Sequence, residues 1–235
     1  MGDRVTAIVL AAGKGARMHS KIQKQYMSLL GRPVITYPLE TFEQSPVDEV
    51  ILVVAPGETE FAQKNILEPY GYHKVSKVVT GGKERYHSVY YALCAIEEAM
   101  EDDHYVLIHD GARAFITPER IEYAISCVKK DKACVMGMPV KDTIKIVDKE
   151  CYALSTPKRS AMWQVQTPQC FLLSEIREAY RKMLESGDTS ATDDGMVMER
   201  YGNRRVRMIE GSYENMKITT PEDLLFGEAI LHGSE

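Results

Sequence analysis

The sequence predicts an α/β fold in which a largely parallel sheet carries helices on both faces. Two observations support it: short apolar runs typical of fully buried strands, and helical patterns that separate one run from the next. The expected strands cover residues 5–11, 49–55, 74–80, 105–109, 133–139 and 205–210. Such alternation favours a parallel sheet, and ligands of these sheets bind at the carboxyl ends of the strands.

The helices between the strands are predicted from apolar spacing and from capping residues. The clearest covers residues 84–100, where Val89, Leu93, Ile96 and Met100 recur at three- and four-residue steps and form one apolar stripe. Further helices are expected to begin after Pro33, Gly57, Thr117, Leu173 and Thr220. Two of these, Thr117 and Thr220, place a capping hydroxyl before a proline at the first helical position.

Residues 140–166 interrupt the alternation. Residues 143–148 alternate and contain β-branched side chains, which predicts an exposed strand, and a second extended piece is expected around residues 151–155. Together they predict a β-arm that projects from a single domain spanning residues 1–235. Because unpaired strand edges favour pairing with another chain, we expect residues 140–166 to be a dimerisation element of a homodimer.

Length and charge limit the classes of function. The 235 residues suit one α/β domain, and the 44% hydrophobic and 27% charged content is ordinary for a globular protein. The net charge of −5 argues against a general nucleic-acid or membrane-surface binder. A phosphate site would therefore have to be a local basic pocket in an acidic protein.

The cysteines and the apolar runs bear on the compartment. The chain has five cysteines, an odd number, and none of them forms a C-x-x-C pair. This predicts reduced thiols in a cytoplasmic protein. No apolar run approaches the length of a membrane span, and the first residues carry no signal-peptide pattern, so we expect no membrane partner.

A glycine loop follows the first expected strand and predicts a triphosphate site. Gly13 and Gly15 allow backbone N–H groups to approach phosphate oxygens closely. Cations that can add charge follow at Lys14, Arg17 and Lys24. A dinucleotide-binding fingerprint requires a third glycine where Met18 stands, which argues against a nicotinamide cofactor site. No Walker motif is present, which argues against a P-loop.

Polar residues also follow the third and fourth strands. Residues 81–82 with Ser88 could form either a backbone-lined slot for a base or ribose, or a tight turn with a helix cap. Asp110 is well placed to hold Mg²⁺, which prefers carboxylate and phosphate oxygens. Arg113 could pair with Asp110 in a structural ion pair or with the ligand. His109 alone is expected to be a packed or hydrogen-bonded histidine and not a ligand.

Seven ordered motifs together resemble the sugar-phosphate nucleotidyltransferases and, within them, the 2-C-methyl-D-erythritol 4-phosphate cytidylyltransferase family. The motifs lie at residues 10–18, 24–26, 81–89, 109–113, 142–145, 166–169 and 215–219. They run from the first strand to the last helix, so the resemblance covers essentially the whole chain. It implies a Rossmann-like nucleotidyltransferase domain with a mostly parallel mixed sheet and a projecting β-arm.

The resemblance implies that the chain joins CTP and 2-C-methyl-D-erythritol 4-phosphate, with Mg²⁺, to give CDP-methylerythritol and pyrophosphate for non-mevalonate isoprenoid precursors. By the family's pattern, Arg17 and Lys24 are catalytic and Asp110 helps to position the metal. The implied nucleotide-binding residues are Leu10, Ala11, Ala12, Gly13, Gly15, Gly82 and Ser88. The implied acceptor-binding residues are Arg159, Lys217, Thr143, Asp110 and Arg113.

The family's arm, which here carries Thr143 and Arg159, reaches into the neighbouring subunit's site, so the resemblance implies a shared active site. The alternative is ribitol-5-phosphate cytidylyltransferase, a sister enzyme that typically has Ser-Val where this chain has Gly111-Ala112. A non-catalytic nucleotide-binding module would be expected to lose Arg17, Lys24 or Asp110. Four residues depart from the family's pattern. Gln23 and Ala114 stand where proline is frequent, Lys83 where some members carry aspartate, and Gly195 where alanine is frequent.

Overall fold

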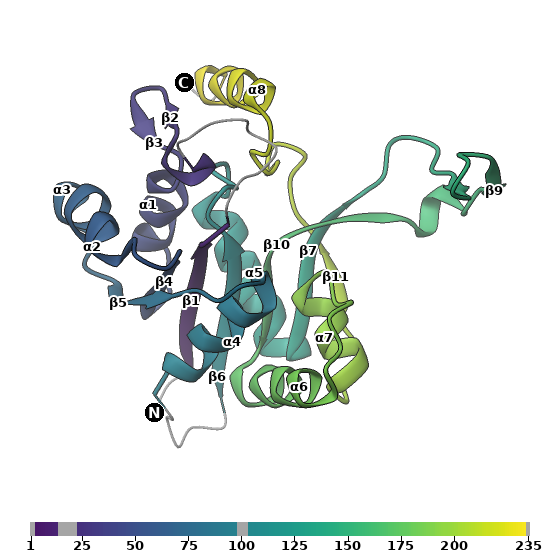
Figure 1. Cartoon of the computed structure of the whole chain (residues 1–235), viewed down its shortest axis with the longest axis horizontal. Coiled ribbons are helices and arrows are strands. Elements are labelled where there is room, and N and C mark those ends of the chain that lie inside the picture. Colours follow the sequence, from purple (N-terminus) through teal and green to yellow (C-terminus); the bar gives the residue numbers. More distant parts are fainter. Residues whose placement is uncertain (1–2, 14–22, 98–102, 234–235) are drawn as a thin grey trace.

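The computed structural model describes residues 3–13, 23–97 and 103–233, and its centre is a seven-stranded sheet (Figure 1). The strand order is β11-β7-β10-β6-β1-β4-β5. The strands are β1 (Arg4–Ala11), β4 (Glu49–Val54), β5 (Val75–Thr80), β6 (His104–Asp110), β7 (Ala133–Pro139), β10 (Trp163–Leu172) and β11 (Arg207–Glu210). The six strands expected from the sequence are all present, and the predicted α/β fold class is confirmed.

The sheet is parallel except for β10. The pairs β1/β4, β1/β6, β4/β5 and β11/β7 are parallel, whereas β10 runs antiparallel to both β6 and β7. The carboxyl ends of the parallel strands therefore meet at one edge of the sheet, and β10 begins at that same edge. This edge collects the polar loops that the sequence singled out.

Helices pack on both faces because alternate residues of each strand point to opposite sides. On one face, Ala7 and Val9 join a core with α1 (Thr36–Gln44) and α5 (Pro118–Asp131). On the other, Ile8 joins a core with helices α4 (Arg85–Ala95), α6 (Leu173–Ser186) and α7 (Asp194–Tyr201). β1 is thus buried on both sides, as its unbroken apolar run predicted.

Smaller elements surround the sheet. They are η2 (Lys24–Tyr26), β2 (Ser28–Leu29), β3 (Arg32–Pro33), α2 (Thr59–Ala62), η3 (Gln63–Leu67), α3 (Glu68–Tyr70) and α8 (Pro221–His232). Helix α5 begins as predicted, since the Thr117 hydroxyl accepts from the Arg120 N–H at 3.4 Å. At the start of α8, Asp223 accepts from the Thr220 N–H at 2.8 Å.

Three expectations about helices and strands are corrected. The helix expected over residues 84–100 ends at Ala95, and Ile96 is extended. Side chains cap this end, because Lys77 donates to the Ala95 carbonyl and Arg177 to the Ile96 carbonyl. Strand β10 and helix α7 were not expected at all. Proline disfavours the interior of a sheet, but Pro168 lies within the register shift of β10 between Val165 and Gln169.

Two short strands lie far from the sheet, on the extension seen at the right of Figure 1. They are β8 (Ile146–Val147) and β9 (Ala153–Ser155), which pair antiparallel, and η4 (Arg159–Ala161) follows them. The base of the extension is closed by a hydrogen bond from the Val140 N–H to the Met162 carbonyl at 3.1 Å. Its apolar side chains at Ile146, Tyr152 and Leu154 are between 51% and 70% exposed.

Two further expectations concern thiols and membranes. All five cysteines are free; Cys127, Cys134 and Cys170 are buried, and Cys94 and Cys151 are exposed. Within the described ranges, no helix combines the length and apolar character needed to cross a bilayer.

Candidate active site

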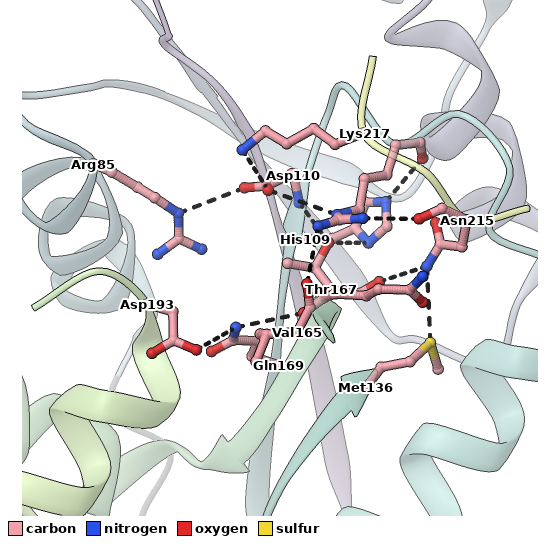
Figure 2. Close-up of polar contacts among 12 residues, drawn as sticks. Arg85, His109, Asp110, Met136, Val165, Thr167, Gln169, Asp193, Asn215 and Lys217 are labelled. Carbon is pink, nitrogen blue, oxygen red and sulfur yellow. Dashed lines mark hydrogen bonds and ion pairs between the residues drawn. The ribbon is translucent and has the colours of Figure 1, made fainter. Parts of the chain in front are cut away.

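The carboxyl edge of the sheet brings five segments of the chain together, and Figure 2 shows polar contacts among residues of four of them. Residues 10–13 cover the end of β1 and the turn after it, residues 81–88 follow β5, and residues 110–113 begin at the last residue of β6. Residues 165–169 of β10 and residues 215–217 complete the set. The motifs are spread over more than 200 positions in sequence, and the sheet topology alone makes them neighbours.

Two glycines permit the close approach of these segments. The Gly111 N–H donates to the Leu10 carbonyl at 2.8 Å, and a Cβ at position 111 would lie 2.9 Å from that carbonyl oxygen. The Gly81 N–H donates to the Val54 carbonyl at 2.7 Å, and a Cβ there would lie 2.6 Å from the Ala12 Cβ. Any side chain at either position would push the strand ends apart.

Ser88 organises the glycine turn after β5. Its hydroxyl accepts from the Gly82 N–H at 3.1 Å and donates to the Glu84 carbonyl at 3.3 Å. The structural alternative raised for this motif, a turn with a helix cap, is therefore present. Gly82 and Ser88 nevertheless also line a cavity, so the turn shapes the wall of a site.

Asp110 lies at the centre of the site, surrounded by three cations (Figure 2). Lys217 Nζ lies 2.8 Å from Oδ2, Arg113 Nε lies 3.8 Å from Oδ2, and Arg85 Nε lies 3.5 Å from Oδ1. The Asp110 side chain is only 12% exposed. Burial by itself would raise the pKa of this carboxyl, but the attraction of Arg85, Lys217 and Arg113 outweighs it and lowers the pKa far below its usual value. Asp110 is therefore a carboxylate.

His109 is a buried, neutral hydrogen-bonding residue. Burial lowers the pKa of His109 to about 4. Nε2 lies 3.1 Å from the Arg113 carbonyl, which can only accept, so Nε2 carries the hydrogen. Nδ1 then accepts from the Thr167 hydroxyl at 3.1 Å, and that hydroxyl accepts from the Asp110 N–H at 3.1 Å. The expectation that His109 is hydrogen-bonded is confirmed.

The Arg113 and Lys217 side chains project from backbone that is held in place. Arg113 donates to the Asn215 carbonyl at 2.8 Å, and buried Asn215 donates to the Thr167 carbonyl at 2.9 Å. On the other side of Lys217, the Ile218 N–H donates to the Ala112 carbonyl at 2.8 Å. These contacts tie the 215–218 segment to β6 and β10 and aim Lys217 at Asp110.

Arg85 is fixed by a second carboxylate. It makes two hydrogen bonds of 2.7 Å to the oxygens of Asp194, whose side chain is fully buried. The Tyr180 hydroxyl also donates to Asp194. Arg85 is therefore shared between Asp194 and Asp110, and together with Lys217 and Arg113 it balances the charge of Asp110.

Two cavities open at this edge and share Arg85, Asp110 and Lys217. The first cavity is lined by the glycine turns, and the second by β10 and α7. Residues that complete the wall of the first include Leu10, Ala12, Gly13, Lys24, Gly82 and Ser88. Residues that complete the wall of the second include Arg113, Val165, Thr167, Gln169, Thr192 and Glu199.

The structure brings most of the predicted site residues together. Ala11 is the exception among residues 10–13, since its side chain is buried in the core and its carbonyl accepts from Gln25. Thr143 and Arg159 are exposed on the projecting extension and line neither cavity of their own chain. Gly15 and Arg17 lie outside the described residues.

Asp110 also fits the predicted magnesium ion. It is ionised, and Mg²⁺ is commonly bound through one or two carboxylates together with substrate phosphates. Across residues 3–13, 23–97 and 103–233, no group of three or more His, Cys, Asp or Glu side chains could hold a metal. A magnesium ion at Asp110 would therefore need further ligands, such as substrate phosphates.

Several residues of the site were not identified from the sequence. Arg85 stood in a motif without an assigned role, and its partner Asp194 lies 109 positions away. Thr167 and Asn215 were also part of motifs only, although both are buried hydrogen-bonding residues at the centre of the site. Long-range contacts of this kind leave no local signal in one sequence.

The comparisons with known proteins agree with this geometry. Residues 5–233 match the family model for 2-C-methyl-D-erythritol 4-phosphate cytidylyltransferase. The protein of that name from Lachnoclostridium phytofermentans is 46% identical over 229 residues, 97% of each chain. Its namesake from Alkaliphilus oremlandii is 47% identical over 230 residues, 97% of this chain and 95% of its own.

Solved structures show the same fold. The 4-diphosphocytidyl-2C-methyl-D-erythritol synthase of Anaerococcus prevotii superposes with a TM-score of 0.84 at 34% identity, covering 98% of this chain and 99% of its own. The cytidylyltransferase from Thermus thermophilus gives a TM-score of 0.78 at 28% identity, covering 97% and 99%. The chain therefore belongs to the 2-C-methyl-D-erythritol 4-phosphate cytidylyltransferase family of nucleotidyltransferases.

Proposed function

We propose that this chain joins CTP and 2-C-methyl-D-erythritol 4-phosphate to give CDP-methylerythritol and pyrophosphate, a step of isoprenoid precursor biosynthesis. One observation carries the proposal beyond family membership: two cavities meet at the Asp110, Arg85 and Lys217 cluster. In this proposal, CTP occupies the cavity beside the glycine turns and the acceptor phosphate occupies the cavity beside β10. The two reacting phosphates then meet at the shared cationic wall.

The cations are needed because two anions must come into contact. A phosphate oxygen of the acceptor attacks the α-phosphorus of CTP in line, and pyrophosphate leaves. At 4 Å, two like unit charges repel by about 4 kcal/mol at an effective dielectric constant near 20. Lys217 and Arg113 would receive the acceptor phosphate, while Lys24 and, by resemblance, Arg17 would stabilise the charge that develops on the triphosphate.

The reaction does not require a general base. A phosphate monoester is largely dianionic at neutral pH, so the attacking oxygen carries no proton that must be removed first. His109 could not serve as one, because both ring nitrogens are engaged with Arg113 and Thr167. His109 therefore acts as a support for the loop that carries Asp110.

Asp110 would hold Mg²⁺ together with the phosphates of CTP, and the bound metal would neutralise part of the triphosphate charge. In the structure, Asp110 accepts from Lys217 instead. The same carboxylate thus holds Lys217 beside the cavity assigned to the acceptor phosphate.

We also propose that the protein is a homodimer in the cytoplasm. The exposed apolar side chains of β8 and β9 support a partner chain at this extension, and the five free thiols suit a reducing compartment. In the dimer, as the resemblance implies, Thr143 and Arg159 would reach the acceptor cavity of the other subunit; in their own chain they line neither of the two cavities at the sheet edge.

A product assay tests the proposed function. The protein is incubated with CTP, Mg²⁺ and either methylerythritol phosphate or ribitol 5-phosphate, and the product is identified by mass. We expect CDP-methylerythritol and pyrophosphate. Formation of CDP-ribitol alone would establish the alternative acceptor, and absence of any cytidylyl product would overturn the assignment.

Mixed dimers test the shared site. Arg159→Ala should weaken the use of methylerythritol phosphate and leave CTP affinity unchanged by calorimetry. Mixing Arg159→Ala with Lys24→Ala should restore part of the activity, because one hybrid site contains both native residues. Loss of CTP affinity, or no recovery after subunit exchange has been demonstrated, would contradict the arrangement.

A further inference from the structure

Lys24 lies in the short element η2, and both of its neighbours in sequence are anchored by their side chains. The Gln25 side chain is almost fully buried and donates to the Ala11 carbonyl at the end of β1. The Gln23 amide donates to a carboxylate oxygen of Glu58. Lys24 itself lines the first cavity. The position of its backbone is therefore set by contacts on either side.

Glu58 is the shared anchor of this segment. Its second oxygen accepts from the Tyr26 hydroxyl at 3.0 Å, and the Tyr26 ring packs edge-on against Phe61 with centroids 4.8 Å apart. Burial, together with the Glu58 carboxylate, raises the pKa of Tyr26, so the hydroxyl remains a donor. Glu58 thus holds residues on both sides of Lys24.

Glu58 is in turn attached to the sheet. Its N–H donates to the Ala55 carbonyl, one residue beyond the end of β4, at 3.0 Å, and its carbonyl accepts from the Ala62 N–H at 2.8 Å. β4 and β1 are adjacent parallel strands. Lys24 is consequently tied to the carboxyl ends of two neighbouring strands, through Gln25 to β1 and through Glu58 to β4.

The backbone conformation of Gln23 is one that a proline would hold by itself, whereas glutamine needs a contact such as the one with Glu58. The Gln23 φ of −65° and ψ of 142° are values that proline adopts without strain. Glutamine does not restrict φ in this way. Within the described residues, the Gln23 N–H donates no hydrogen bond, so a proline would break none there.

We propose that Glu58 is a positioning residue for Lys24, and that its contacts with Gln23 and Tyr26 provide the restraint that a proline at position 23 would otherwise provide. The proposal rests on the role of Lys24 in the proposed function. A catalytic cation misplaced by about 1 Å can cost up to a hundredfold in rate. The contacts of Glu58 therefore bear on kcat and on CTP, and not on the acceptor cavity, whose wall does not include Lys24.

The test compares Glu58→Ala in two backgrounds. In the wild-type background we expect kcat to fall by about tenfold or more, with KM for methylerythritol phosphate unchanged. In the Gln23→Pro background, the same substitution should change kcat by less than about twofold, because proline holds the backbone. Glu60→Ala is the matched control, since Glu60 lies in α2, the helix for which Glu58 is the N-cap, and its side chain pairs with exposed Lys64; it should leave kcat unchanged.

Each outcome decides the proposal. An unchanged kcat in Glu58→Ala, or an equal loss in both backgrounds, would overturn it. Urea unfolding of every variant separates misplacement of Lys24 from general destabilisation, because loss of stability would lower activity in Glu58→Ala and in its Gln23→Pro counterpart alike. If wild-type protein forms product and Lys24→Ala does not, while Glu58→Ala is normal, only the positioning role fails and the proposed function stands.

Discussion

Replacing Lys24 by alanine should lower kcat by about a hundredfold or more. Lys24 lines the cavity assigned to CTP, and its ammonium would stabilise negative charge that develops as pyrophosphate leaves. Loss of one such charge-stabilising donor typically costs a factor of about a hundred to a thousand. The measurement is steady-state release of pyrophosphate with both substrates saturating, accompanied by KM for each substrate.

The matched control for Lys24→Ala is Lys64→Ala. Lys64 is 65% exposed and pairs with Glu60 on the outside of the molecule, so its loss removes the same charge without touching the site. We expect Lys64→Ala to retain wild-type kcat and stability. A kcat near wild type in Lys24→Ala would exclude the role assigned to Lys24.

The second large effect concerns stability. Arg85→Met should lower the free energy of unfolding by about 3–5 kcal/mol, because removal of one partner leaves a buried charge without compensation. Asp194 is completely buried, and Arg85 donates to both of its oxygens. Only the Tyr180 hydroxyl and the dipoles around Asp194 would remain. Urea unfolding at neutral pH measures the loss.

Two comparisons separate this effect from the mere loss of an arginine. Arg181→Met removes an arginine that is 46% exposed and pairs with Glu178 and Glu185, and it should cost less than about 1 kcal/mol. Adding Asp194→Asn to Arg85→Met should recover part of the loss, since the buried group is then uncharged. A loss below about 1 kcal/mol in Arg85→Met would show that the buried pair is not important for stability.

The local parts of the fold were predictable from the sequence. The apolar runs of β1, β4 and β6 are buried on both sides in the structure, which is why their residues could be recognised without any partner. The start of α5 was predictable for a similar reason, because Thr117 caps it with its own hydroxyl. In each case, the residues that determine the element lie within it or beside it in sequence.

The unexpected elements depend on distant residues. Strand β10 contains Pro168, and its place between β6 and β7 follows from pairing with residues 24 or more positions away. The end of α4 is set by Lys77 and Arg177, which approach its carbonyls from β5 and α6. Neither contact has a counterpart in the pattern of the segment itself.

The same division applies to the site. Short sequence motifs contain the residue types that the site needs, which are glycines at strand ends and cations after them. They can be recognised in the sequence because close backbone approach and charge depend on single residues. Which cations surround Asp110, how Asp194 and Asp110 share Arg85, and where two cavities meet depend on strand order and helix packing. Electrostatic energy depends on distance in space, and only the folded chain sets the distances between residues that lie a hundred positions apart.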